Sequence, residues 1–225
     1  MAYSVFVGAG QWVGVVDDER AQGLFGFDAD LGEWQPINEG LPDNLEVRYI
    51  AIRPDQPQTV YAGTQEGPYV SNDGGMNWRA LPLPEGTAAE DKVVWSICLD
   101  PSDAETIYVG TQGTTVFRSR NGGADWQRLP IEPPEGCLKA NFPMRVIRIA
   151  VASHDPDDIL VAFEIGGLVR SRDGGQTWQS CNKVLLEMTG QQHLKSAIVS
   201  DNEIEGMMDS HALALSAKHP DTVWL

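Results

Sequence analysis

The feature that most constrains this chain is an eight-residue pattern that occurs three times at nearly constant spacing. The three copies run Ser71–Trp78, Ser119–Trp126 and Ser171–Trp178, and their tryptophans lie 48 and 52 residues apart. A weaker copy ends at Trp34, 44 residues before Trp78, with Ala29 where the others have an acidic or amide side chain. A repeat of this length predicts one supersecondary unit per copy, with neighbouring units stacked to share a core.

Each residue type in the pattern suits a tight hairpin turn. The side chain at the third position can accept backbone N–H bonds within the turn, as a carboxylate or through an amide oxygen. The glycines permit the positive φ that such a turn requires. A tryptophan can close over the turn and bury a large apolar surface. We therefore interpret six positions as structural and not catalytic: Asp73, Trp78, Asn121, Trp126, Asp173 and Trp178.

Short apolar segments precede each copy in a fixed order. Thr59–Gln65 matches Thr106–Gln112, and Asp158–Glu164 is a third version of the same segment. They are rich in β-branched and aromatic residues, and glycine or proline interrupts the chain roughly every 8–12 residues, which favours strands over helices. Each unit therefore predicts four short strands, and the fold class is an all-β propeller of four-stranded antiparallel blades.

These motifs resemble the Asp-box (BNR-type) repeat of sialidases, xyloglucanases, sortilin-type receptors and photosystem-assembly propellers. The resemblance covers nearly the whole chain and implies a β-propeller. We expect one partial propeller domain over 1–225, with blades at 1–46, 47–93, 94–145 and 146–209 and the start of another at 210–225. The first blade is expected to begin at its second strand, and the remaining blades of the ring are expected beyond Leu225.

Two segments interrupt the regular spacing, one over 11–22 and the other over 182–210. The second contains a stretch, 183–195, that could form a short helix. Long loops on propellers can form binding walls, and they can equally be packing loops.

Composition excludes several classes of function. The chain carries 32 acidic and 16 basic residues, a formal net charge of −16, which disfavours nucleic acid and anionic membranes as partners. Its three cysteines and four histidines show no metal-ligand spacing, so neither a metal nor a cofactor is expected. The start of the chain lacks a leader-like pattern and no stretch is long and apolar enough to span a membrane, which predicts a cytoplasmic protein.

The resemblance places ligands on the face where the innermost strands of the blades begin, here called the channel face. The turns between the second and third strands belong to the same face. Aligning the repeats selects positions that differ from blade to blade, as a ligand site requires. We expect ligand-binding roles for Arg48, Tyr49, Trp95, Arg145, Arg148 and His211.

Glu164 is the sharpest candidate for chemistry, because two other blades place Gln65 and Gln112 at its position. It could act as a general acid or base, with Asp209 or Glu46 as the second carboxylate of a glycoside hydrolase. It could equally be an ion-paired surface residue. If Glu164 and a second carboxylate lie about 5–10 Å apart in an open cleft, the catalytic interpretation gains. If Glu164 forms a salt bridge with a neighbouring arginine and the central channel is plugged, the binding interpretation gains.

Three function classes follow from these observations. The first is a non-catalytic propeller scaffold that binds a protein, a carbohydrate or another small ligand at its channel face. The second is a propeller glycoside hydrolase, xyloglucanase-like or, less well supported, sialidase-like, since Arg48, Arg145 and Arg148 invite comparison with a carboxylate-binding arginine cluster. The third is an assembly factor for a membrane complex, which the acidic balance disfavours. The sequence leaves open whether the chain is an enzyme, and we favour the first class.

Overall fold

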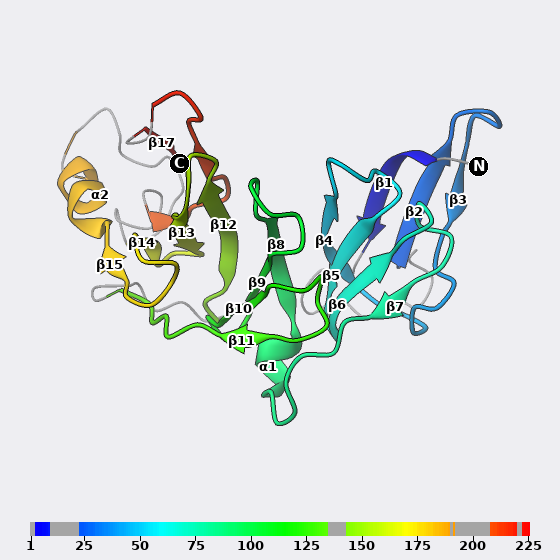
Figure 1. Ribbon diagram of the computed structural model, residues 1–225, viewed down its shortest axis with the longest axis horizontal. Coiled ribbons are helices and arrows are strands. Elements are labelled where there is room, and N and C mark those ends of the chain that lie inside the picture. Colours follow the sequence, from blue (N-terminus) through cyan, green and yellow to red (C-terminus); the bar gives the residue numbers. More distant parts are fainter. Residues whose placement is uncertain (1–2, 10–22, 135–142, 190, 192–207, 220–221) are drawn as a thin grey trace.

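In the part of the chain that the structure describes, the strands form five antiparallel sheets arranged one after another along an arc. The computed structural model describes residues 3–9, 23–134, 143–189, 191, 208–219 and 222–225. Figure 1 shows the arc with β4, β8 and β12 toward its concave side and the labelled termini at opposite ends. The expected all-β class and the antiparallel blade architecture are confirmed.

Each sheet follows the chain from strand to adjacent strand. The first sheet contains β1 (Tyr3–Ala9), β2 (Gly23–Asp28) and β3 (Glu33–Pro36). The second contains β4 (Val47–Ile52), β5 (Val60–Thr64), β6 (Gly67–Ser71) and β7 (Arg79–Ala80). The third contains β8 (Val94–Leu99), β9 (Ile107–Thr111), β10 (Val116–Ser119) and β11 (Gln127–Arg128).

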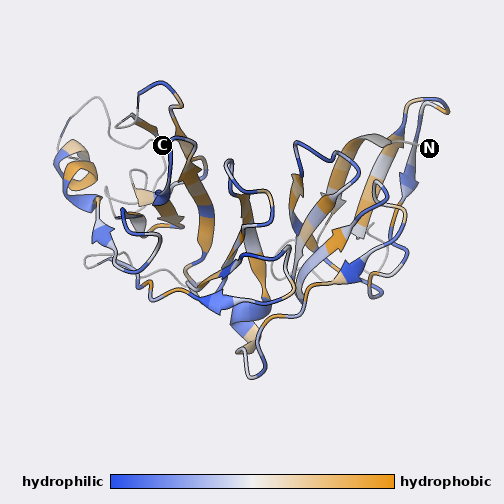
Figure 2. Cartoon of the chain, in the orientation of Figure 1, coloured by the Kyte–Doolittle hydropathy of each residue, from blue (hydrophilic) through white to orange (hydrophobic). Residues whose placement is uncertain are grey.

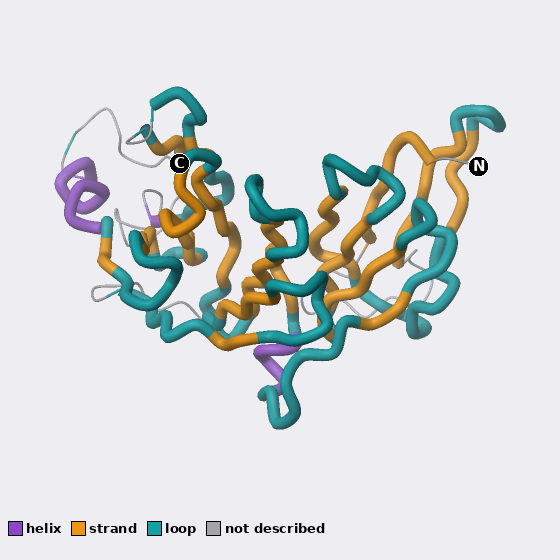
Figure 3. The backbone as a smooth tube through the Cα atoms, viewed as in Figure 1, coloured by secondary structure: helices purple, strands orange, loops and turns teal. Residues whose placement is uncertain are grey.

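The fourth sheet repeats this order with β12 (Val146–Ala152), β13 (Asp155–Phe163), β14 (Gly167–Ser171) and β15 (Gln179–Ser180). A two-stranded sheet of β16 (Ala214–Leu215) and β17 (Val223–Trp224) follows. We refer to these sheets as blades 1 to 5. Two helices flank the strands in Figure 3: α1 (Ala89–Lys92) precedes β8, and α2 (Asn182–Thr189) follows β15. The helix α2 lies where the sequence predicted one, whereas the 11–22 insertion lies outside the described residues.

The core lies between the blades. One cluster joins Leu24 and Ile37 of blade 1 to Val60 of blade 2, and another joins Tyr61 of blade 2 to Val109 of blade 3. The fully buried second and third strands β5, β6, β9 and β10 form the middle of this core. Figure 2 shows the contrast between these apolar second and third strands and the hydrophilic fourth strands β7 and β11. Burial of apolar surface between blades therefore dominates the stability of the arc.

A glycine in the second strand sets how closely two blades approach. A Cβ added at Gly110 would lie 2.3 Å from Val146 Cγ1 and 2.4 Å from Ser96 Oγ. A Cβ added at Gly63 would likewise lie 2.8 Å from Val94 Cγ1 of the next blade. The recurrent glycine of the Tyr-x-Gly-Thr segment is thus explained by close packing against the first strand of the following blade.

Candidate functional site

The same irregularity occurs at the start of the first strand in blades 2, 3 and 4. The pairing register shifts between Val47 and Tyr49, between Val94 and Ser96, and between Val146 and Arg148. The residues left out of the register are Arg48, Trp95 and Ile147. A β-bulge re-aims a side chain and is common beside functional sites. The bulge therefore displays a different side chain in each blade on a common backbone.

The turn between the second and third strands is tied to the start of the first strand in each of these blades. The N–H of Gln65 donates to Glu46 O (3.4 Å), that of Gln112 to Val93 O (2.9 Å), and that of Glu164 to Arg145 O (2.9 Å). These bonds bring the turn residue beside the residue that leads into the bulged strand. Glu164 consequently lies next to Arg145, although 19 positions separate them in sequence.

Trp95 of blade 3 contacts arginines from the blades on either side. The guanidinium carbon of Arg48 lies 4.2 Å from the centroid of the indole, and that of Arg145 lies 4.1 Å from it. Both distances are within the range of cation–π attraction. The sequence left open whether Trp95 stacks on a sugar or packs within the protein. In the structure it packs against two guanidinium groups.

Each of these two arginines also has a carboxylate partner. Arg48 Nη2 pairs with Glu46, and Arg145 Nη1 lies 3.0 Å from Glu164 Oε1 and 2.9 Å from Oε2. These contacts therefore form an alternating series that spans three blades: Glu46, Arg48, Trp95, Arg145 and Glu164. We call these five residues the channel ladder. Its charges are paired internally, so Arg48 and Arg145 are not free to bind an anion without breaking an ion pair.

Glu164 occupies an environment with opposing effects on its ionisation. The residue is only 8% exposed, and this burial raises the pKa of the carboxyl. The charge of Arg145 lowers the pKa but does not overcome the effect of burial, and nearby Asp209 raises it further. The turn that carries Glu164 is also strained, because the next residue, Ile165, is β-branched and has a φ of 53°. Strain of this kind is found at functional sites, where surrounding structure must maintain it.

Two further pairs complete the set of predicted site residues. His211 Nε2 and Asp209 Oδ2 lie 3.1 Å apart on the segment that leads into β16. Arg148 lies with its guanidinium carbon 5.6 Å from the ring centroid of Tyr49 and donates to Ile147 O at 2.7 Å. In the described part of the chain Arg148 has no carboxylate partner, unlike Arg48 and Arg145.

The pattern residues lie at the other end of the third strand from this face. In blade 2, Asp73 Oδ1 accepts from Ser71 Oγ (2.7 Å) and from the N–H of Asn77 (2.9 Å), and Gly75 N–H donates to Ser71 Oγ (2.8 Å). Asp173 in blade 4 makes the equivalent bonds at 2.7 and 2.8 Å. Asn121 does so through its amide oxygen in blade 3, at 2.9 Å to both Ser119 and Asp125. These side chains act locally on their own turns.

The weaker copy in blade 1 uses a residue that the sequence alignment did not select. Asp28, one position before Ala29, accepts the N–H groups of Asp30 (2.9 Å) and Leu31 (3.1 Å) and is almost fully buried. An aspartate at the first residue of a shortened turn was the signal that could have identified it. The turn closes less completely, since Trp34 remains 49% exposed while Trp78 is 5% exposed.

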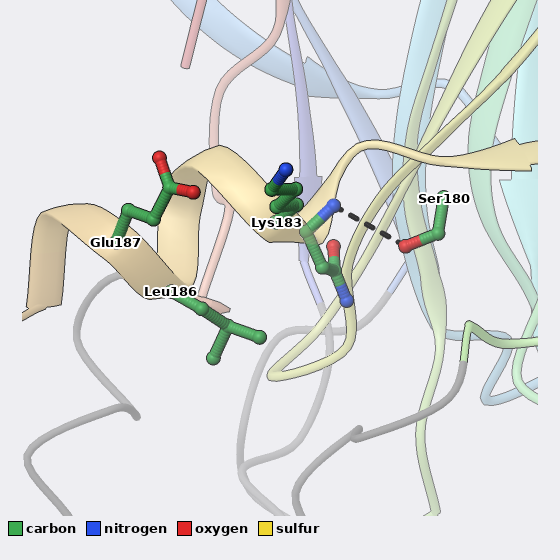
Figure 4. Close-up of a pocket in the computed structure, with 5 residues that line it drawn as sticks. Ser180, Lys183, Leu186 and Glu187 are labelled. Atoms are coloured by element: carbon green, nitrogen blue, oxygen red, sulfur yellow. Dashed lines mark hydrogen bonds between the residues drawn. The ribbon is translucent and has the colours of Figure 1, made fainter.

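The described residues contain no cluster of His, Cys, Asp and Glu arranged to hold a metal ion. No helix in the described part of the chain is long and apolar enough to cross a membrane. A hollow of about 660 Å³ lies beside the first turn of α2, lined by Ser180, Asn182, Lys183, Leu186 and Glu187 (Figure 4). It contains none of the predicted site residues.

Comparison with known proteins agrees with this architecture. The BNR/Asp-box repeat model matches residues 169–180, which contain the whole of the third strong copy of the pattern. A solved structure of an ancestral GH74 enzyme superposes with a TM-score of 0.53 at 21% identity, covering 76% of this chain and 24% of that one. The chain is built from Asp-box β-propeller blades. The recognition of the Asp-box repeat in the sequence is thereby confirmed.

Two curated relatives of these Asp-box blades are xyloglucanases. Xyloglucanase Xgh74A of Acetivibrio thermocellus is 26% identical over 216 residues, covering 77% of this chain and 26% of the relative. The oligoxyloglucan-reducing end-specific xyloglucanase of Emericella nidulans is 30% identical over 161 residues, covering 68% of this chain and 19% of the relative. The chain thus spans about a quarter or less of the length of these relatives.

Proposed function

We propose that the Asp-box blades form a ligand-binding scaffold whose recognition surface is the channel face. The observation that carries this proposal is the engagement of Glu164 by Arg145 at 2.9–3.0 Å within a largely buried environment. A buried, ion-paired carboxylate organises neighbouring groups, and it is less available to transfer a proton than a free one. The strained turn at Ile165 supports a functional role for the same surface.

The other polar chemistry of the face comes from the half-buried Arg148, Tyr49 and Asp209 and from the exposed His211. Arg148 offers a guanidinium that has no carboxylate partner among the described residues, and Tyr49 offers an aromatic ring beside it. Such a pair suits a ligand with a planar polar group or a sugar ring. The named activity of the relatives makes xyloglucan oligosaccharides the first ligands to test.

A glycoside hydrolase of the xyloglucanase type is the second candidate, and a sialidase-like activity is a weaker version of it. The similarity to two xyloglucanases favours it, as does the raised pKa of Glu164, since a general acid must hold its proton. The mechanism requires a second carboxylate across the scissile bond. Its two candidates are both engaged, Glu46 by Arg48 and Asp209 by His211.

One experiment addresses both candidates. Xyloglucan oligosaccharides are titrated into the protein by calorimetry, and the release of reducing ends is assayed in the same mixtures. Binding without release is expected, with an affinity lowered about tenfold or more by Arg148→Ala. Arg53→Ala, in an ion pair away from the channel face, should leave the affinity unchanged. Release by the wild type that Glu164→Gln abolishes would replace the scaffold with the hydrolase.

If oligosaccharides neither bind nor react, the carbohydrate version of the proposal is wrong. The channel face would then be tested with protein ligands, by affinity capture with the wild type and with Arg148→Ala in parallel. Partners retained by the wild type and lost in the variant would keep the scaffold function.

A further inference from the structure

Alternate side chains of the second strand pack on opposite neighbours within the arc. Val60 and Ala62 of blade 2 belong to a cluster with Leu24 of blade 1. Tyr61, between them in sequence, belongs to a different cluster with Val109 of blade 3. Successive side chains of a strand point to opposite sides of the sheet, so each blade has two apolar faces. We call the face toward the preceding blade the front face and the face toward the following blade the back face.

The strand β1 occupies the place of the second strand in blade 1. A Cβ added at Gly8 would lie 2.9 Å from Val47 Cγ1 of blade 2, the close approach that the recurrent glycine makes in blades 2 and 3. Phe6 packs into the cluster that blade 1 shares with blade 2 and therefore belongs to the back face. Val5 and Val7, on either side of it, belong to the front face.

The front face is exposed in blade 1 and buried in the next three blades. Val5 and Val7 are 48% and 45% exposed. The pairing register sets Phe27 opposite Val5 and Trp34 opposite Phe27, so the 49% exposed Trp34 shares this face. The second-strand positions equivalent to Val5 and Val7 in blades 2, 3 and 4 are at most 1% exposed: Val60, Ala62, Ile107, Val109, Ile159 and Val161. Blade 1 thus displays a surface that a neighbouring blade covers elsewhere in the arc.

The other end of the arc exposes a back face. The strand β17 is the second strand of blade 5, because 222–225 aligns with 59–62. Val223 packs on the buried cluster of blade 4, so it belongs to the front face and Trp224 to the back face. Trp224 is 64% exposed. Its equivalents in blades 2 and 3 are at most 3% exposed: Tyr61 and Tyr108.

The two exposed faces complement each other as the buried ones do. Inside the arc, the back-face ring of Tyr108 shares a cluster with the front-face side chains Ile159 and Val161 of the next blade. The aromatic ring of Trp224 and the front face of blade 1 offer the same combination. Blades 1 and 5 lie at opposite ends of the arc (Figure 1), so a contact between them joins two molecules.

We propose that copies of this chain associate head to tail, with the back face of blade 5 in one copy packed on the front face of blade 1 in the next. The occupant of each exposed face is thus a blade of a second copy, which continues the blade-to-blade packing already present within the arc. Contact between unlike faces is heterologous, and it forms a ring where the rotation closes and a longer chain where it does not. The proposal does not depend on what the channel face binds.

The charge of the chain sets the conditions for this contact. Each copy has a formal net charge of −16, so like charges oppose association while the apolar faces favour it. Added salt screens the repulsion and strengthens effective apolar burial. Association should therefore tighten as the salt concentration rises.

Sedimentation velocity of the whole chain over a series of protein concentrations tests the proposal. The double variant Val5→Asp with Val7→Asp disables the front face, and Trp224→Asp disables the back face. Every contact needs one face of each kind, so each variant alone should sediment as a monomer where the wild type associates. Met76→Asp replaces a similarly exposed apolar side chain in the turn of blade 2 and should associate as the wild type does.

Mixing the two disabled variants separates a lost contact from a lost fold. The front-face variant keeps its back face and the back-face variant keeps its front face, so an equimolar mixture should form one-to-one pairs and nothing larger. A wild type that stays monomeric at all salt concentrations would overturn the proposal, and so would a mixture that stays monomeric. Association retained by Trp224→Asp alone would show that like faces meet, which also contradicts it.

Discussion

The two ends of the blades differ in how much they repeat. At the pattern end, Asp73, Asn121 and Asp173 make the same contacts in three blades, with the serine-to-acceptor distance between 2.7 and 2.9 Å. At the channel end, equivalent bulge positions hold Arg48, Trp95 and Ile147, and their contacts cross from blade to blade. The comparison shows that the pattern end closes every blade with the same turn, whereas the channel end carries the side chains by which the blades differ.

Removing the arginine of the buried ion pair should have the largest effect. Arg145→Leu leaves Glu164 buried without its cation. We expect the free energy of unfolding, measured in urea near neutral pH, to fall by about 3 kcal/mol. The loss should shrink at acid pH, because burial already raises the pKa of Glu164 and protonation removes the charge. Arg53→Leu breaks pairs whose carboxylates are half exposed and should cost less than about 1 kcal/mol. Equal losses would contradict the special role of the channel end.

Replacing Trp95 with the residue that blade 4 has at its bulge should have an intermediate effect. Trp95→Ile removes two guanidinium–indole contacts and much buried area, and the expected loss in unfolding free energy is about 2 kcal/mol. Trp34→Ile, at the exposed turn of blade 1, is the matched control and should cost less than about 1 kcal/mol. Chemical denaturation of both variants measures the difference. If Trp95→Ile left the free energy of unfolding unchanged, the bulge positions would be interchangeable between blades.

A smaller effect should appear at the pattern end as a change in acid stability. The hydrogen bond from Thr177, with the backbone and Ser171 bonds, lowers the pKa of Asp173 to about 2. A depressed folded-state pKa stabilises the protein above the unfolded value of about 3.9 and ceases to do so as pH falls through about 2. Asp173→Asn should therefore reduce the dependence of the melting temperature on pH between these two values. Asp30→Asn serves as control, because the side chain of Asp30 makes no hydrogen bond or ion pair with the described residues. An unchanged pH profile in Asp173→Asn would contradict the assignment.

The smallest effect is expected from exchanging the two side chains of one turn. Asp73 bonds Asn77 at 2.8 Å, and Asn121 bonds Asp125 at 3.0 Å, so blade 3 carries the same amide–carboxylate pair in reverse. The double change Asp73→Asn with Asn77→Asp should alter the free energy of unfolding, measured by chemical denaturation, by no more than about 0.5 kcal/mol. The single change Asn121→Asp sets two carboxylates together and should be worse. A large loss from the double change would mean that the turns are not equivalent.

Much of the fold could be predicted from residues that are close in sequence. The pattern turns and the strand order rest on contacts within one repeat, and the propeller architecture follows from the recurrence of that repeat along the chain. The structure and the comparisons confirm all three. The alignment missed Asp28 because this residue stands one position earlier in the pattern than Asp73, Asn121 and Asp173, and Ala29 occupies the position aligned with them. The blade boundaries and the assigned roles of Glu164, Asp209 and the other site residues stay predictions.

The channel ladder was only partly visible in the sequence. Aligning the repeats selected Arg48, Trp95, Arg145 and Glu164 one blade at a time, but nothing in the alignment indicated which of them would touch. The pairing of Arg145 with Glu164 depends on the bond that ties the turn to the strand start, and the placement of Trp95 depends on a bulge. Neither follows from spacing or propensity.

By itself, the sequence determined the unit of this protein, a blade closed by an Asp-box turn. The side-chain hydrogen bonds that Ser71 and Asp73 make in that turn join residues no more than four positions apart. Only the tertiary structure decided how the charges of the channel face are satisfied. Arg48, Trp95 and Arg145 come from three blades, and their contacts exist because glycines such as Gly110 let the blades approach closely enough for side chains to reach across.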